Sequence, residues 1–192
     1  MRPHLASPVF AIFLPLIIGC GDASRPTDPS STLAARSNIA DAHASASQRL
    51  INMSDACDPA TFNAAVGPGT CVNRQGGVTF AHFIAQLTRN QQAGAWHFAP
   101  STASASVGQS LLAVNRGGEV HTFTHVAAFG GGIVPPLNTL SGNPVPAPEC
   151  LALEPDDFVA PGKTYEEDLS AAGTQRFQCC IHPWMRLTVQ TQ

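Results

Sequence analysis

Short apolar runs separated by glycine- and proline-containing turns dominate the chain beyond residue 55. This pattern predicts buried strands over residues 111–114, 119–126, 165–169, 175–179 and 186–189. Trp96 and Phe98 alternate just before Pro100, which places the intervening His97 on a solvent face. Many short strands favour a mainly β fold, a β-sandwich with Greek-key connections.

One short helix is expected where apolar residues recur at helical spacing after Thr79, a candidate N-cap: Phe80, Phe83, Ile84 and Leu87. Residues 129–148 are rich in glycine and proline and show no regular period. We therefore expect a long loop insertion there, opened by a flexible glycine turn.

The N-terminal residues indicate export of the chain. Residues 5–18 form an apolar run after Arg2 that is short for a bilayer span and contains two prolines. This predicts a signal peptide over residues 1–19. Its end, Ile-Ile-Gly-Cys, resembles the lipobox of bacterial lipoproteins, which implies cleavage before Cys20 and acylation of that residue. A simple secretory peptide with an incidental Cys20 is the alternative.

Composition limits the rest of the chain to one domain and few classes of partner. Residues 20–54 are mostly small or polar and predict a lipid-anchored flexible tether, which leaves residues 55–192 as the folded domain. With 192 residues, 44% hydrophobic and 12% charged, the chain can bury one core. The net charge of −3 provides no basic stripe, so no nucleic acid is expected, and a membrane is expected only through the anchor, on the periplasmic or cell-surface side.

A thiol, an imidazole and a thioether occur close together as Cys179, His182 and Met185. Soft sulfur donors favour copper, and two histidines and one cysteine with a weak axial methionine form the type 1 (blue) copper arrangement. The second imidazole must come from a distant strand. His121 is the leading candidate because it follows a Gly-Gly turn, and His125 is the alternative ligand because it shares strand parity with His121.

The ligand loop resembles that of cupredoxins, particularly the short-loop amicyanin type, at Gly173-Thr174, Phe177, Cys179, His182-Pro183, Met185-Arg186 and Val189. The stretch 117–121, Gly-Gly-Glu-Val-His, is similar to the first-histidine strand of plastocyanin-like proteins. The resemblance implies a cupredoxin-like sandwich with one copper ion that cycles between its cuprous and cupric states. It implies an electron carrier that turns over no substrate.

Cys179 rather than Cys180 has the spacing to His182 and Met185 found in this family. In an extended strand Cys179 also shares a face with Phe177, whereas Cys180 points away. A disulfide between Cys179 and Cys180 is a strained alternative.

The remaining thiols are expected in disulfides in an oxidising compartment. Cys57 and Cys71 bracket a turn-rich segment, and a disulfide there would close a loop of about 15 residues, worth roughly 3 kcal/mol. That pairing leaves Cys150 for Cys180. Four cysteines permit three pairings, so the pattern stays open at this point.

Three residues beside the ligands are candidates for support or docking. Thr122 is placed to hydrogen-bond to the ligand loop, and Pro183 and Trp184 flank His182 with apolar surface. In cupredoxins the loop histidine reaches the surface, so a redox protein, such as a cytochrome or an oxidoreductase, is the expected partner, with a Trp184 folded onto the sandwich as the alternative. Rival functions are copper storage or delivery with the same ligands, and a metal-free scaffold.

Overall fold

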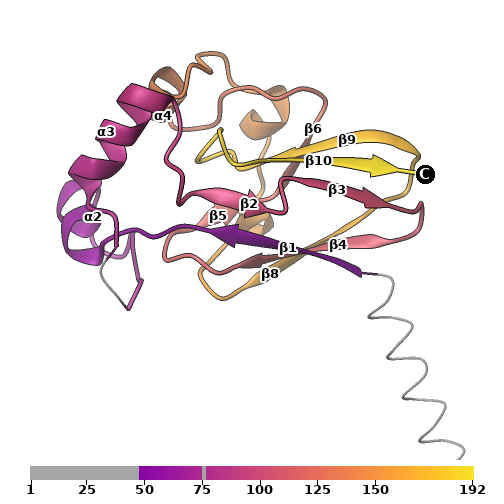
Figure 1. The fold of residues 1–192 in the computed structure, drawn as a ribbon, viewed down its shortest axis with the longest axis horizontal. Helices are drawn as coiled ribbons and strands as arrows, with labels where there is room; N and C mark the ends of the chain where they lie inside the picture. Colours follow the sequence, from indigo (N-terminus) through magenta and orange to yellow (C-terminus); the bar gives the residue numbers. More distant parts are fainter. Residues whose placement is uncertain (1–47, 75–76) are drawn as a thin grey trace, which may run out of the picture. The chain divides into compact units, whose positions relative to one another are not determined.

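Two four-stranded sheets form the body of the domain. The computed structural model describes residues 48–74 and 77–192 (Figure 1). The first sheet has the order β2-β1-β4-β8 and consists of β1 (Gln48–Ser54), β2 (His97–Ala99), β4 (Ser110–Asn115) and β8 (Thr164–Asp168). Strand β1 runs parallel to β4 and antiparallel to β2, and β4 and β8 are antiparallel.

The second sheet has the order β3-β10-β9-β6. It consists of β3 (Thr102–Ala105), β6 (Thr124–Val126), β9 (Gly173–Gln178) and β10 (Arg186–Thr191). Strand β10 pairs parallel with β3 and antiparallel with β9, which also pairs antiparallel with β6. A separate two-stranded ladder joins β5 (His121–Thr122) to β7 (Phe158–Val159). The mainly β sandwich expected from the sequence is confirmed.

Alternate residues of both sheets meet in one core. Ile51 and Met53 of β1 are fully buried, as are Leu187 and Val189 of β10. Each fully buried side chain of this size contributes about 1.5–3 kcal/mol relative to exposure. The period of two along each strand therefore sets which residues face the partner sheet.

The break between β5 and β6 divides the strand expected over residues 119–126. Phe123 lies at this break, and its ring stacks on that of Phe177 with the centroids 4.8 Å apart. His121 and Thr122 therefore pair with β7, whereas the residues after Phe123 pair with β9.

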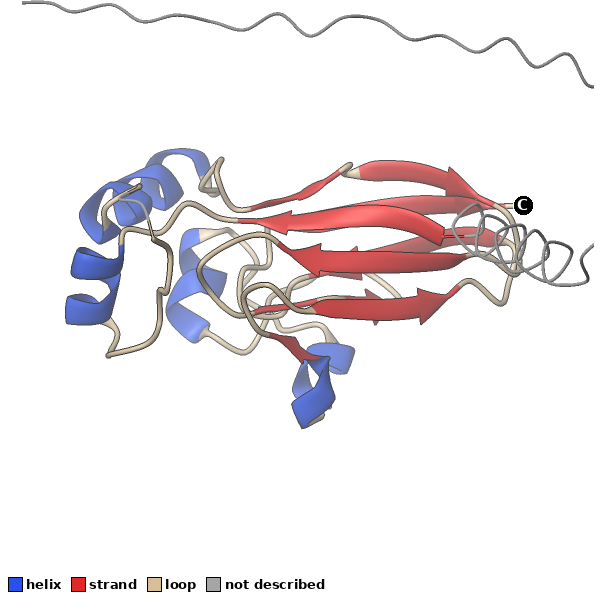
Figure 2. Ribbon diagram, turned by 90° about the horizontal axis from the view of Figure 1, so that it is seen from below, coloured by secondary structure: helices blue, strands red, loops and turns tan. Residues whose placement is uncertain are grey.

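Helices gather at one end of the strands, opposite the C-terminus (Figures 1 and 2). They are α2 (Pro59–Ala65), α3 (Phe80–Asn90) and α4 (Pro135–Leu140). Helix α3 is the predicted one: the Thr79 side chain accepts a hydrogen bond from the His82 amide, and Phe83 and Leu87 are buried. The expectation of a single helix is wrong.

Helix α2 lies within the loop closed by the disulfide between Cys57 and Cys71. The Asp58 carboxylate accepts the Thr61 amide, and Pro59 occupies the first turn, where its missing N–H leaves no hydrogen bond unmade. These end signals are present in the sequence, but a seven-residue helix with one buried apolar side chain, Phe62, shows no periodic stripe.

The insertion extends beyond the expected residue 148 and contains α4, the short 3₁₀ helices η1 (Pro148–Leu151) and η2 (Pro155–Asp157), and strand β7. It is not opened by a flexible glycine turn as expected. Gly131 and Gly132 are buried, and a β-carbon on Gly132 would overlap the Cys180 carbonyl oxygen. The Ile133 amide donates to that same carbonyl at 2.7 Å. The insertion is therefore packed directly on the segment that carries Cys179.

The expected tether boundary at residue 54 is wrong, because residues 48–54 form β1, which lies between β2 and β4. Polar residues Gln48, Arg49 and Asn52 obscured the alternation that buries Ile51 and Met53. The signal peptide over residues 1–19, Cys20 and the tether up to residue 47 lie outside the described residues. Within the described part of the chain, no helix has the length and hydropathy needed to cross a membrane.

Candidate metal centre

Three side chains from distant parts of the chain converge at the helical end of the sandwich. His121 begins β5, Cys179 directly follows β9, and His182 lies in the loop before β10. The Cys179 Sγ lies 3.8 Å from the Nδ1 of His121 and 3.7 Å from the Nδ1 of His182. All three side chains are buried, so they form a group that could hold a metal ion.

The ligand loop is closed by its own backbone. The Cys179 amide donates to the Met185 carbonyl at 3.0 Å, and the Met185 amide donates to the His182 carbonyl at 2.9 Å. Met185 is fully buried, in the same apolar cluster as Cys179. These bonds fix the spacing of the three residues within a tight turn.

Thr122 joins β5 to this loop through two hydrogen bonds. Its backbone amide donates to the Cys179 Sγ at 3.4 Å, and its Oγ1 accepts the Cys180 amide at 2.7 Å. The structure thus places Thr122 beside the loop, where the sequence suggested a supporting role. An amide donor at the sulfur stabilises the thiolate form of Cys179.

Asp55, which sequence reasoning missed, holds the far side of His121. Its Oδ2 accepts from the His121 Nε2 at 2.9 Å and from the Glu119 amide at 3.0 Å. Its Oδ1 accepts the amides of Gly118 at 3.0 Å and Cys57 at 3.2 Å. Because Nε2 donates to this carboxylate, the neutral imidazole presents the Nδ1 lone pair to Cys179.

The Asp55–His121 pair is fully buried, with both side chains at 0% exposure. Burial opposes ionisation of Asp55, but the bonds from His121 and from two backbone amides outweigh it and lower its pKa to about 2. Burial likewise disfavours the imidazolium, yet Asp55 and Cys179 raise the pKa of His121 to about 9. A metal ion would therefore displace a proton from His121 at neutral pH.

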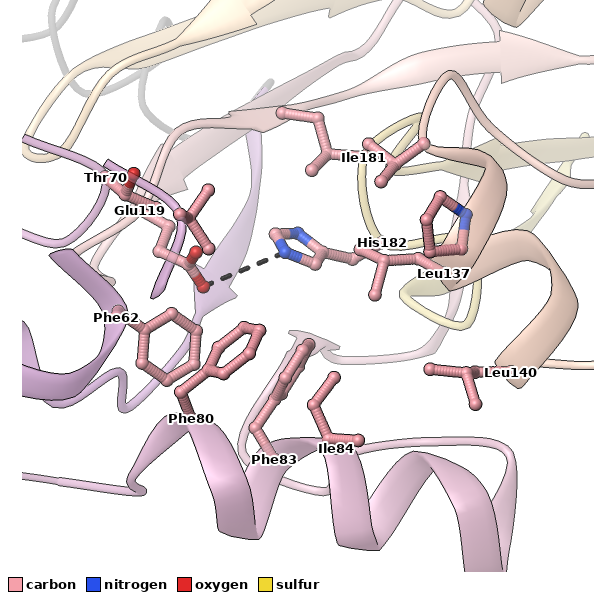
Figure 3. Close-up of a pocket in the computed structure, with 13 residues that line it drawn as sticks. Phe62, Thr70, Phe80, Phe83, Ile84, Glu119, Leu137, Leu140, Ile181 and His182 are labelled. Atoms are coloured by element: carbon pink, nitrogen blue, oxygen red, sulfur yellow. Dashed lines mark ion pairs between the residues drawn. The ribbon is translucent and has the colours of Figure 1, made fainter. Parts of the chain in front are cut away.

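Glu119, also missed, lies near the Nε2 of His182. Its Oε2 accepts from the Trp96 Nε1 at 2.6 Å and forms an ion pair with the His182 Nε2 at 3.7 Å (Figure 3). Burial is the main influence on Glu119 and raises its pKa, despite the neighbouring His182 and the Trp96 hydrogen bond. Residues two apart on a strand share a face, and Glu119 precedes His121 by two residues. This parity was the one signal in the sequence that could have indicated a role for Glu119.

The electrostatics favour a thiolate at Cys179. Burial opposes its ionisation, but hydrogen bonds and charge from His121 and His182 hold its pKa well below the usual range. The thiolate is the form of cysteine that binds metal ions. Among the described cysteines it alone carries a free thiol.

The other four described cysteines form two disulfides, Cys57–Cys71 and Cys150–Cys180. The second connects η1 in the insertion to the residue next to Cys179. A second group of potential donors, Asp55, Cys57 and Glu119, has its sulfur in a disulfide.

His125 lies apart from the centre. It is exposed on β6, with its ring centroid 5.1 Å from that of Phe177. It does not belong to the group formed by His121, Cys179 and His182. Because the strand breaks at Phe123, His121 and His125 do not lie on one face of a single strand. This removes the reason to propose His125 as the alternative ligand.

The apolar surface expected beside His182 is not open. His182 is 2% exposed, Pro183 is buried, and the half-buried Trp184 packs with its ring centroid 5.9 Å from that of Phe83. Helix α3 therefore covers the face on which the sequence predicted that a partner protein docks.

No protein-family model matches the chain, and no curated protein matches its sequence. Several solved structures resemble it. A purple cupredoxin from Nitrosopumilus maritimus is 14% identical, and the match covers 74% of this chain and 98% of that one with a TM-score of 0.42. A mutant fern plastocyanin is 14% identical, over 75% of this chain and 100% of that one, with a TM-score of 0.39.

A mutant amicyanin in its Cu(I) form is 18% identical, over 50% of this chain and 73% of that one, with a TM-score of 0.35. At these identities and TM-scores, the similar structures give no information about the function of this chain. The chain has a cupredoxin-like fold, as its two packed sheets and the grouping of His121, Cys179 and His182 indicate.

Proposed function

We propose that this chain is a type 1 copper protein that transfers single electrons. The observation that carries the proposal is the group of two imidazole Nδ1 atoms within 3.8 and 3.7 Å of a buried cysteine sulfur. Two imidazoles, a thiolate and a thioether are the donor set of such a site, so His121, Cys179 and His182 would hold the ion together with Met185, at the end of the same loop. When bound, copper would supply one-electron chemistry by alternating between its cuprous and cupric states.

The surrounding residues are suited to hold such a centre fixed. Asp55 and Glu119 orient the two imidazoles from behind, and the Thr122 amide supports the sulfur. Buried ligands in a closed loop change their positions little when the charge of the centre changes. This keeps the reorganisation energy of electron transfer low. These features favour electron transfer over storage or delivery, which requires ready release of the metal.

We further propose that the chain acts outside the cytoplasm, anchored through an acylated Cys20, and exchanges electrons with a redox protein. Two disulfides support an oxidising compartment. Metabolic labelling with palmitate tests the anchor: the full chain should incorporate label and a Cys20→Ala variant should not. Equal labelling of both would overturn the lipid attachment at this residue.

A redox titration with a chelator challenge tests the function. The copper-loaded protein should cycle reversibly through a single one-electron step and retain its copper in both oxidation states. A His125→Ala variant should behave identically, because that side chain is exposed and outside the group, whereas His121→Ala should lose the reversible step. Rapid loss of copper to the chelator in either state would support copper handling instead.

A further inference from the structure

A cavity of about 300 Å³ lies between the helices and the ligand loop (Figure 3). Its lining is almost entirely apolar. Aromatic rings come from α2 and α3, aliphatic side chains come from α4, and Ile181 comes from the loop. The rings are Phe62, Phe80 and Phe83, and the α4 residues are Pro136, Leu137 and Leu140. An apolar hollow of this size falls at the lower end of the range for small-molecule sites.

The polar end of the cavity is formed chiefly by Glu119 and His182. Their side chains are 9% and 3% exposed, so each presents a small part of its surface. A second cavity of about 190 Å³, which shares Thr70 and Ile181 with the first and is also bordered by Val120, reaches the same two residues. Two hollows therefore converge on one carboxylate–imidazole pair.

We propose that the larger cavity binds a small aromatic alcohol or phenol, with its ring among the phenylalanines and its hydroxyl group at Glu119 and His182. A cavity of roughly 150 Å³ is enough to hold benzene, so about 300 Å³ admits one substituted ring. Tilted aromatic rings such as those of Phe62 and Phe83, with centroids 5.4 Å apart, favour edge and offset contacts with a further ring.

The polar end selects a hydroxyl group rather than a charge. A hydroxyl group both donates and accepts, so it can satisfy a carboxylate oxygen and an imidazole nitrogen together. A ligand carboxylate would meet the Glu119 carboxylate in a poorly solvated place, which is costly. The proposal for this cavity does not rest on the proposed electron transfer, although the bound molecule would lie against His182.

Calorimetric titration of the purified, metal-free full chain with p-cresol tests the site, and p-xylene is the matched ligand in which a methyl group replaces the hydroxyl. We expect saturable binding of one p-cresol per chain and binding of p-xylene about tenfold weaker. Glu119→Gln should weaken p-cresol about fivefold, because a neutral acceptor replaces a charge-assisted one, and should leave p-xylene unchanged.

Leu140→Phe, which fills the cavity, should abolish binding of both compounds. Leu151→Phe, at a position 69% exposed on η1, is the control and should bind as the native chain does. Equal affinity for the two ligands, or no binding of p-cresol up to its solubility limit, would overturn the proposal. If Leu140→Phe fails to fold by near-ultraviolet circular dichroism, the comparison of the two ligands on the native chain still decides the outcome.

Discussion

The two imidazoles of the candidate centre are supported by carboxylates in two contrasting ways. On the closed side, Asp55 contacts His121 at 2.9 Å, and neither side chain has any exposed surface. On the cavity side, Glu119 lies 3.7 Å from His182, with side chains 9% and 3% exposed. The closed side is thus sealed within the fold, whereas the cavity side borders two hollows.

The backbone explains this difference. Both oxygens of Asp55 accept backbone amides, from the turn before β5 and from Cys57. A β-carbon on Gly117 would overlap the Asp55 carboxylate, so the absence of a side chain at this position leaves room for the carboxylate. Glu119 instead accepts from a side chain, the Trp96 indole. A side-chain partner can move with its carboxylate, whereas three backbone donors cannot.

The largest effect is expected from Asp55→Asn. Because N–H donors face both oxygens, the amide group of asparagine must oppose a donor in either orientation. We expect a loss of about 3–5 kcal/mol in the free energy of unfolding of the metal-free protein, measured by urea denaturation. Asp58→Asn is the control, since asparagine caps a helix as well as aspartate does. Similar losses in the two variants would contradict the rigidity of the closed side.

A second effect is the pH dependence of the metal-free protein. The folded pKa of Asp55, about 2, lies below its ordinary 3.8, so its contribution is present above pH 4 and is lost as the pH falls toward 2. The folded pKa of His121, about 9, lies above its ordinary 6.5, so its contribution is present below pH 6.5 and is lost as the pH rises toward 9. Stability should therefore decline below pH 4. Above pH 6.5 the loss at His121 is opposed by the Cys179 thiolate, whose folded pKa lies well below its ordinary 9.0, so the alkaline decline should appear in a Cys179→Ser variant.

Denaturation midpoints measured from pH 3 to pH 9 would check this profile. When Asp55→Asn is added to Cys179→Ser, the decline on the alkaline side should be much shallower, because the imidazolium loses its counter-charge. An unchanged alkaline decline in that variant would show that some other group causes it.

A smaller effect is expected from Glu119→Gln on the cavity side. The glutamine carbonyl can still accept the Trp96 indole N–H, so the loss in unfolding free energy should be about 1 kcal/mol. Urea denaturation beside Asp55→Asn provides the direct comparison. A loss as large as that of Asp55→Asn would remove the distinction between the two sides.

The parts of the centre that could be predicted from sequence are those encoded locally. Cys179, His182 and Met185 occupy one short loop, and the apolar stripe of α3 has a clear helical period. Asp55 could not be found in this way, because its partners Gly118, Glu119 and His121 lie 63 to 66 residues further along the chain. A lone aspartate after a strand of mixed polarity carries no local sign of such a role.

Helices α2 and α4, which line the cavity beside His182, were missed for a related reason. They are seven and six residues long and depend on prolines in the first turn and on packing, and α2 also on its Asp58 cap, rather than on a repeating apolar face. The segment that carries α4 is held to the ligand loop by the Cys150–Cys180 disulfide and by the close approach of Gly132 to Cys180. Both are contacts between distant segments, and composition and period do not encode them.

The central claim, a copper ion bound by the Cys179 thiolate between His121 and His182, is tested most directly by the visible absorption spectrum of the copper-loaded chain. We predict an intense thiolate-to-copper charge-transfer band in the native protein and its loss in a folded Cys179→Ser variant. A native protein that takes up copper without this band, or a band that survives the substitution, would contradict the claim.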